Sequence, residues 1–150
     1  PQTVSLFSGT VRDNITIGVD EFDDDFLLRV SEVSGVMSWL AKTPNGFDYK
    51  LSEGGKELSG GQRQTIAIAR ALIRKPHYIV LDEPTANMDT ATEQLVLKNL
   101  AEYFTDETLL IVTHRMAPLS LVQRIVVLDA GRVNVDGPKE KILERLKGAA

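Results

Sequence analysis

The sequence contains no cysteine and no long apolar run. The lack of cysteine excludes disulfides, thiol catalysis and cysteine-ligated zinc. No stretch approaches the roughly 18 to 20 consecutive apolar residues that a helix needs to cross a bilayer, and no signal peptide is recognisable. Any association with a membrane would therefore require a partner.

An excess of positive charge is also lacking. The 17 lysine and arginine residues are outnumbered by 21 aspartate and glutamate residues, so that the net charge is −4. This balance argues against nucleic-acid binding driven by attraction to phosphates. At 150 residues, 43% of them hydrophobic and 25% charged, the composition is that of an ordinary soluble domain large enough for one core.

The phosphate-cradling pattern Gly-x-x-x-x-Gly-Lys-[Ser/Thr] is absent as well. The one Gly-Lys pair is Gly55-Lys56, with Lys50 where the first glycine should stand and Glu57 where the hydroxyl should stand. The chain therefore lacks the loop that supplies most phosphate contacts in such proteins.

Two motifs nevertheless indicate a nucleotide site. The run Leu58-Ser59-Gly60-Gly61-Gln62 predicts a turn that opens a helix, and such a turn offers backbone N–H groups and the positive end of the helix dipole to an anion. The apolar run at 78–81 predicts a buried strand that ends in Asp82 and Glu83. Carboxylates at the end of such a strand suit a Mg²⁺-phosphate.

Taken in order, the motifs resemble those of ABC-type ATPases, the nucleotide-binding domains of ABC transporters. Gln2 is similar to the Q-loop glutamine, Leu58–Gln62 to the signature motif, Ile79–Glu83 to the Walker B strand, Asn87–Asp89 to the D-loop and Thr113–Arg115 to the switch histidine. The chain has no initial Met and begins just before Gln2. We therefore expect a C-terminal fragment of such a domain, whose intact form is an ATPase and which is inactive alone.

The expected fold is α/β: a partial P-loop NTPase core with a mostly parallel sheet and a helical subdomain, without the Walker A strand and loop. Residues 1–57 are expected to hold the Q-loop and helical subdomain, and residues 58–150 the signature helix and the C-terminal half of the core. The patterns predict helices at 23–33, at 36–41, from Gly60 to about Lys75 and at 90–104, and strands at 78–82, 109–113, 124–129 and 133–135.

The resemblance implies ATP and Mg²⁺ as cofactors. Asp82, with Gln2, is the expected Mg²⁺ partner, and Glu83 is expected to polarise the attacking water. As a neutral imidazole, His114 would donate one N–H to the γ-phosphate and accept a hydrogen bond with its other nitrogen. The alternative interpretations are two solvated acids at the end of a strand and a structural histidine.

In this family the signature turn acts across an interface, where it closes over the nucleotide of a second nucleotide-binding domain in a head-to-tail dimer. The resemblance thus implies nucleotide contacts for a set of residues that comprises Gln2, Leu58, Ser59, Gly60, Gly61, Gln62 and Asp89. Gln62 is expected to support the loop. As an alternative, Ser59 is a helix N-cap worth about 1 kcal/mol, and both roles are compatible.

The segment after Gln2 and the pair Glu53-Gly54, which is similar to an exporter X-loop, favour an exporter over a DNA-repair or other nucleic-acid ATPase. A solvated acidic loop remains the alternative for Glu53-Gly54. Residues 82–89 and 117–124 resemble type I protein or peptide secretion ATPases, with lipid or drug exporters as the alternative. The implied partners are a second nucleotide-binding domain and a transmembrane domain, with no nucleic acid, at the cytoplasmic face of a bacterial inner membrane.

In the family, the strand that leads into the phosphate loop lies between the strand ending at His114 and the strand at 124–129. Its absence would leave two strand edges unpaired, and such edges recruit other strands. We therefore expect either direct pairing of these two strands or self-association with another copy of the chain.

Overall fold

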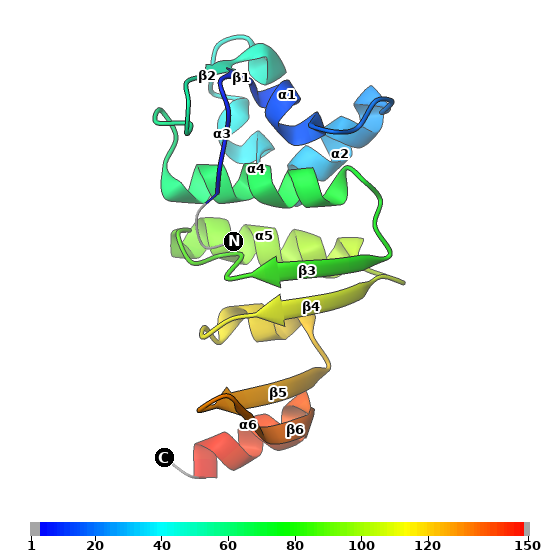
Figure 1. The fold of residues 1–150 in the computed structure, drawn as a ribbon, viewed down its shortest axis with the longest axis vertical. Helices are drawn as coiled ribbons and strands as arrows, with labels where there is room; N and C mark the ends of the chain where they lie inside the picture. Colours follow the sequence, from blue (N-terminus) through cyan, green and yellow to red (C-terminus); the bar gives the residue numbers. More distant parts are fainter. Residues whose placement is uncertain (1–3, 149–150) are drawn as a thin grey trace.

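The computed structural model describes residues 4–148 as an α/β fold. In chain order its elements are β1 (Gly9–Thr10), α1 (Val11–Thr16), α2 (Asp24–Val33), α3 (Met37–Leu40), η1 (Gly46–Asp48), β2 (Lys50–Leu51), α4 (Gly60–Leu72), β3 (Tyr78–Asp82), α5 (Thr90–Tyr103), β4 (Thr108–Val112), η2 (Ala117–Leu121), β5 (Arg124–Asp129), β6 (Arg132–Pro138) and α6 (Lys139–Gly148). Helices α1 to α3 gather at one end and α6 lies at the other (Figure 1). None of the helices in this part of the chain is both long and apolar enough to cross a membrane.

Helix α4 begins at a capping box. The Ser59 hydroxyl accepts from the Gln62 backbone N–H at 3.1 Å, and the Gln62 side chain accepts from the Ser59 N–H at 2.8 Å, so that two orphan donors of the first turn are satisfied. The helix ends at Leu72, three residues before Lys75, which has a positive φ of 49° and is followed by Pro76. The sequence therefore sets both limits of α4 locally.

One hydrophobic core lies around α4. It joins apolar residues of the helical N-terminal part, such as Val11 and Leu27, to Ile66 and Leu72 of α4 and to residues of β3 and α5. Inside it, the Trp39 indole N–H donates to the Thr65 hydroxyl at 3.0 Å and ties α3 to α4. A buried indole N–H needs such a partner.

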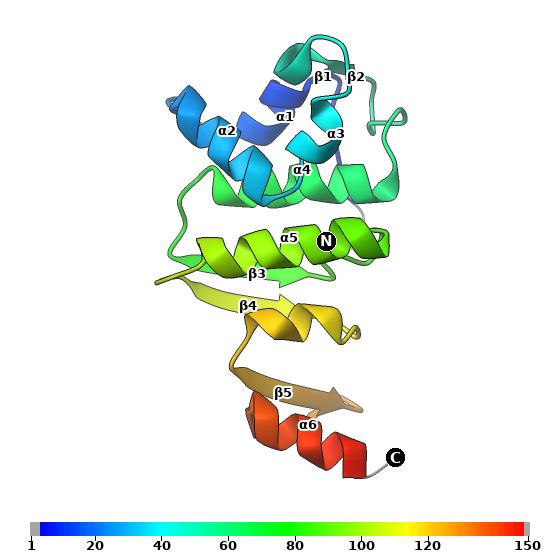
Figure 2. The ribbon, with the colours of Figure 1, turned by 180° about the vertical axis from the view of Figure 1, so that it is seen from behind.

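Strands β3 and β4 pair in parallel, in a register that runs from Tyr78 opposite Thr108 to Asp82 opposite Val112. Burial alternates along β3: Ile79 and Leu81 face the core, while Tyr78 and Val80 are exposed. Helix α5 lies along this pair (Figure 2). Because parallel strands end at the same edge, the residues after Asp82 and after Val112 come together.

The sheet is divided. Among residues 4–148, β3 pairs only with β4, β5 pairs only with β6, and β1 pairs only with β2; the last two pairs are antiparallel. The expectation that β4 and β5 pair directly is wrong. Strand β5 uses one edge for the hairpin with β6, through the tight turn at Ala130 and Gly131, both at positive φ. Its other edge is separated from β4 by η2, which packs against α5 in the connection between the two strands.

The α/β class is confirmed, and so are the predicted helices and strands, to within about two or three residues at their ends. The structure adds α1, η1, η2, α6 and the short pair β1–β2, which the sequence patterns do not predict. The division into 1–57 and 58–150 stays a prediction about roles, since one core contains residues from both ranges.

We predict that the chain self-associates through the unpaired edges of β4 and β5. Large apolar side chains on these strands are exposed, among them Leu110, Val112, Val126 and Leu128, and exposed apolar strands recruit further strands. Light scattering over about 1 µM to about 1 mM should show a rising mass. The double variant Val112→Lys/Leu128→Lys should stay monomeric, whereas Leu95→Lys, on the exposed surface of α5, should behave as wild type. A wild-type chain that is monomeric throughout this range would contradict the prediction.

Candidate functional site

Glu83 follows β3 directly and adopts a left-handed backbone conformation, with φ at 46°. Such a conformation is uncommon for a residue with a side chain and costs energy. It is held in place because the Glu83 N–H donates to the Val112 carbonyl at 2.8 Å, one step beyond the last pair of the β3–β4 ladder. The strained turn therefore directs the Glu83 side chain toward the segment that follows β4.

The Glu83 carboxylate is bound by Thr113 and His114. One oxygen, Oε1, lies 2.6 Å from His114 Nδ1 and accepts from the His114 backbone N–H at 2.9 Å; the other, Oε2, accepts from the Thr113 hydroxyl at 3.2 Å. The Glu83 side chain is only 13% exposed, whereas the His114 side chain is 80% exposed. The structure thus brings together the two predicted catalytic residues and leaves the imidazole facing outward.

Two opposing effects act on the pKa of Glu83. Burial raises it, but the hydrogen bonds from the His114 side chain and backbone, and from Thr113, together lower it below its ordinary value of 4.5. Glu83 is therefore ionised at neutral pH and accepts only. It follows that Nδ1 of His114 carries a proton and donates to Glu83. The N–H of a neutral ring is thus used on Glu83 and not on the γ-phosphate, which differs from the expected arrangement.

The glycine turn at the start of α4 packs against Asn87 and Met88. A Cβ added to Gly60 would lie 2.9 Å from the Asn87 Cβ, and one added to Gly61 would lie 2.9 Å from the Asn87 carbonyl oxygen. Side chains at these positions would therefore push the two segments apart. The predicted signature turn and D-loop are thus neighbours in one chain.

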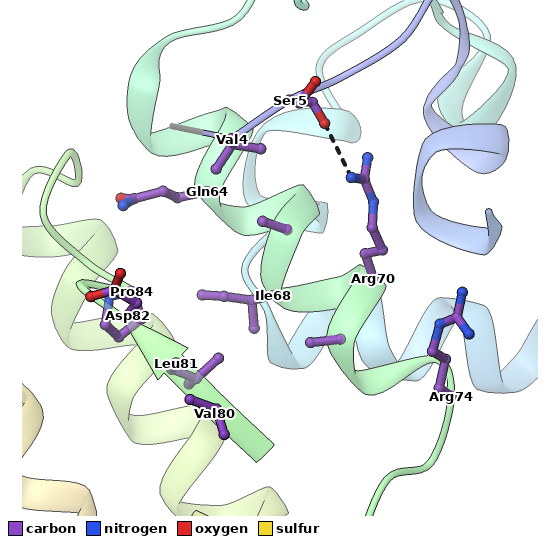
Figure 3. A pocket seen from close by; sticks show the side chains of 12 residues that line it. Val4, Ser5, Gln64, Ile68, Arg70, Arg74, Val80, Leu81, Asp82 and Pro84 are labelled. Atoms are coloured by element: carbon purple, nitrogen blue, oxygen red, sulfur yellow. Dashed lines mark hydrogen bonds between the residues drawn. The ribbon is translucent and has the colours of Figure 1, made fainter. Parts of the chain in front are cut away.

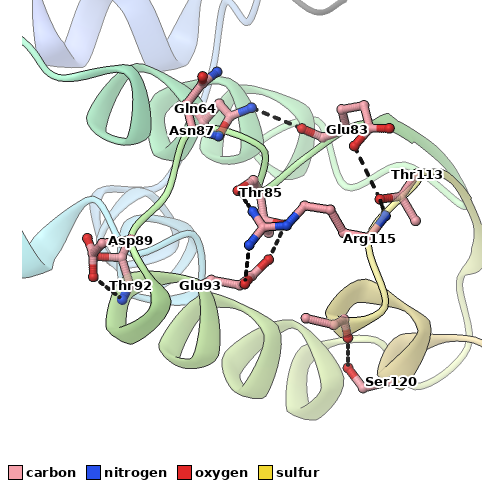
Figure 4. Close-up of polar contacts among 11 residues, drawn as sticks. Gln64, Glu83, Thr85, Asn87, Asp89, Thr92, Glu93, Thr113, Arg115 and Ser120 are labelled. Atoms are coloured by element: carbon pink, nitrogen blue, oxygen red, sulfur yellow. Dashed lines mark hydrogen bonds and ion pairs between the residues drawn. The ribbon is translucent and has the colours of Figure 1, made fainter.

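Gln64 of α4 links the same segment to Glu83. Its amide nitrogen donates to the Glu83 carbonyl at 2.9 Å, and its amide oxygen accepts from the Asn87 N–H at 3.0 Å (Figure 4). Gln64 is 6% exposed. A buried amide with both ends satisfied fixes the geometry of the backbone that it bridges.

The residues before and within the turn have different surroundings. Ser59 is exposed and caps α4, as the alternative interpretation has it, and Gln62 supports the turn through the capping box. Leu58 is buried in the core, so that its side chain is not available to a ligand. Asp89 caps α5 by accepting from the Thr92 N–H at 3.0 Å and the Thr92 hydroxyl at 2.7 Å, and these bonds lower its pKa.

Asp82 lies on the other side of the strand end from the Glu83–His114 pair. It is exposed and lines a pocket of about 610 Å³ together with Gln64, Arg70 and Val80 (Figure 3). The walls of this pocket are mostly apolar side chains of α4 and β3. The two consecutive acids therefore face different surroundings, which agrees with separate roles.

A Mg²⁺ ion would find one protein carboxylate here. Within residues 4–148, no three His, Asp or Glu side chains form a metal-binding cluster. Mg²⁺ bound to phosphates keeps several waters and needs only one or two carboxylates, so the donor chemistry of Asp82 fits such an ion. Gln2, the other expected ligand, lies outside the described residues.

Four residues next to this site have no role in the sequence interpretation, although two of them lie within its motifs: Gln64, Thr85, Glu93 and Arg115. Two of them carried a usable signal. Gln64 and Glu93 are polar residues on the apolar stripes of their helices, with Ile68 and Leu97 one turn later. A polar side chain on such a stripe is buried and needs partners.

We predict that His114→Ala raises the pKa of Glu83, because it removes the ring N–H that stabilises the carboxylate. Carboxyl ¹³C NMR titration of the chain measures this directly.

The lowered pKa of Glu83 contributes stability that is complete above its unfolded pKa of about 4.5 and is lost as pH falls through the folded pKa. The stability difference between wild type and His114→Ala should therefore shrink in that acidic window. Asp136, whose pKa is lowered by Arg124, is the internal control; an unchanged Glu83 pKa would refute the contact.

Similarity to known proteins agrees with this geometry. The chain is 37% identical over 143 residues to the ATP-dependent lipid A-core flippase of Desulfotalea psychrophila. The aligned region covers 95% of this chain and 25% of the flippase. The chain is also 39% identical over 145 residues to the glutathione/L-cysteine transport system ATP-binding/permease protein CydC of Escherichia coli. Here the aligned region covers 97% of this chain and 25% of CydC. The chain thus spans about a quarter of the length of these relatives.

The fold is similar to that of a bacterial Atm1-family ABC exporter with ATP bound, with a TM-score of 0.90 and 30% sequence identity over 100% of this chain and 28% of the exporter. Residues 1–86 match the sequence pattern of ABC transporters. The predicted resemblance is thereby confirmed: the chain belongs to the ABC transporter family.

Proposed function

We propose that this chain is part of the ATP-binding and ATP-hydrolysing subunit of an ABC exporter. The observation that carries the proposal is the Glu83 carboxylate, which Thr113 and His114 hold where β3 and β4 end. An ionised carboxylate at this position is able to orient and polarise a water molecule for attack on a γ-phosphate.

His114 complements this role. Its Nδ1–H donates to Glu83, and the rest of its ring is exposed. A second hydrogen bond to a phosphate oxygen would come from Nε2, and Nε2 has a proton to donate only when the ring is doubly protonated. The same histidine would thus orient Glu83 and contact the developing charge on the phosphate.

Asp82 would hold Mg²⁺, directly or through water, together with Gln2. The ion would neutralise charge on the phosphates during phosphoryl transfer. The separate surroundings of Asp82 and Glu83 support this assignment of metal binding to one residue and water activation to the other, because a carboxylate that binds the metal is not free to act on water.

The exposed Ser59 turn would serve a second nucleotide-binding domain in a head-to-tail dimer. Its backbone N–H groups lie at the start of a long helix and suit an anion. Leu58, Gly60, Gly61 and Gln62 would act through backbone and support, and Asp89 would lie at the same interface. We place this subunit, with a transmembrane domain as partner, at the cytoplasmic face of a bacterial inner membrane.

The cargo is a finer proposal. Sequence resemblance at 82–89 and 117–124 suggested protein or peptide secretion, with lipid or drug export as the alternative. The names of the two relatives above concern lipid A-core and glutathione or L-cysteine. These names support lipid export, which belongs to the alternative of a lipid or drug exporter, more than they support protein or peptide secretion.

We predict that the chain alone binds ATP weakly and hydrolyses it no faster than buffer, because it lacks the Gly-x-x-x-x-Gly-Lys-[Ser/Thr] loop. In the exporter that carries this chain, Glu83→Gln should lower kcat by about 10²-fold to 10⁴-fold and leave ATP binding in place. Phosphate release and nucleotide titration measure the two effects. Turnover by the purified chain that Glu83→Gln abolishes would show instead that the chain is self-sufficient.

We predict that Ser59→Asp blocks ATP-driven dimerisation of the domain, because its carboxylate keeps the helix cap but repels a phosphate. Ser59→Ala is the matched control: it loses a cap worth about 1 kcal/mol but adds no charge. Gly60 variants are less informative, since a side chain there also meets Asn87 in the same chain. If ATP affinity of the monomer falls in step with dimerisation, the turn serves its own subunit.

A further inference from the structure

A carboxylate lies buried beside the site without a role in the mechanism above. Glu93, on the first turn of α5, is 4% exposed. Its Oε1 accepts from the Thr85 hydroxyl at 2.6 Å and its Oε2 accepts from Arg115 Nη2 at 2.8 Å. A buried charge persists only when it is paired and hydrogen-bonded, so the pair joins α5 firmly to the segment after β4.

Arg115 uses its guanidinium on two segments at once. While Nη2 donates to Glu93, Nη1 donates to the Thr85 carbonyl at 2.6 Å (Figure 4). Thr85 thus receives Arg115 at its carbonyl and donates its hydroxyl to Glu93. The planar fork of arginine suits such a double contact, which lysine does not reproduce.

The same residue reaches the catalytic pair through its backbone. The Arg115 N–H donates to the Thr113 hydroxyl at 3.0 Å, and this hydroxyl donates to Glu83 Oε2 at 3.2 Å. Arg115 also follows His114 directly. Fixing the Arg115 side chain therefore restricts both residues that hold the Glu83 carboxylate.

We infer that Arg115, anchored by Glu93, is a positioning residue that keeps Thr113 and His114 against Glu83 for ATP hydrolysis. The inference rests on the proposed function. Loss of the anchor lets the segment after β4 shift, so that the water-activating carboxylate loses its orientation and His114 loses its place beside the developing charge, whereas Asp82 on β3 stays in place. The effect belongs to kcat and not to ATP binding.

The test compares Arg115→Gln and Glu93→Gln with Arg124→Gln. The control removes a guanidinium of the same kind: Arg124 also donates two hydrogen bonds, both to Asp136 at 2.8 and 2.7 Å, but on the exposed β5–β6 hairpin away from the site. In the exporter that carries this chain, both site variants should lower kcat by about 10-fold to 100-fold, with KM for ATP changed less than about twofold. Arg124→Gln should leave both constants unchanged.

A second measurement does not depend on turnover. In the chain itself, NMR resonances of the His114 ring and the Glu83 carboxyl should shift in Arg115→Gln and Glu93→Gln, and stay in place in Arg124→Gln. Circular dichroism establishes that each variant is folded. Folded site variants with wild-type kcat and unmoved His114 and Glu83 resonances would overturn the inference.

If Arg115→Gln and Glu93→Gln fail to fold, Arg115→Lys decides. It keeps the positive charge beside Glu93 but loses the double contact, and we expect a reduced kcat at unchanged KM; a wild-type kcat in folded Arg115→Lys would overturn the inference. Failure of the proposed function would look different, because the wild-type exporter would then hydrolyse no ATP. The NMR comparison would still show whether Arg115 holds the His114 ring and the Glu83 carboxyl in place.

Discussion

Burial of one face of α4 is the constraint on which both the fold and the site depend. Apolar residues of this helix pack on α1 and α2 and join the core that reaches β3 and α5. On the same face, Gln64 fixes the backbone at Glu83 and Asn87. The position of the helix therefore also determines where the glycine turn lies. A change in its packing would therefore move Glu83 directly, without a ligand between them.

Elements with a strong apolar period were predictable from the sequence, whereas most short elements and the largely polar helix α6 were not. The alternating burial of β3 and the apolar stripe of α5 are strong periodic signals, and both elements lie where they predict. Helix α1 has only six residues, which is too short to show a helical apolar period. The capping box between Thr10 and Asp13 is the one local signal in the sequence that indicates its start. The separation of β5 from β4 depends on the packing of η2 on α5, which no local pattern encodes.

The site follows the same division. That Glu83 and His114 meet follows from two parallel strands ending at one edge, which the motif order implies. The direction of their hydrogen bond does not follow from the sequence, because it depends on which ring nitrogen faces the carboxylate. The contact between Glu93 and Arg115 joins residues 22 positions apart and becomes visible only when α5 is placed beside the segment after β4.

The C-terminal hairpin has a consequence for cooperativity. Of the described side chains beyond Leu121, only Ile142 is buried, and it lies outside the core around α4. Strands β5 and β6 and helix α6 pack chiefly on one another. Amides in this unit therefore owe their protection from solvent exchange to local contacts, while those of α4 and β3 exchange only when the main core opens. The chain thus has two levels of stability, and the Glu83–His114 pair belongs to the higher one.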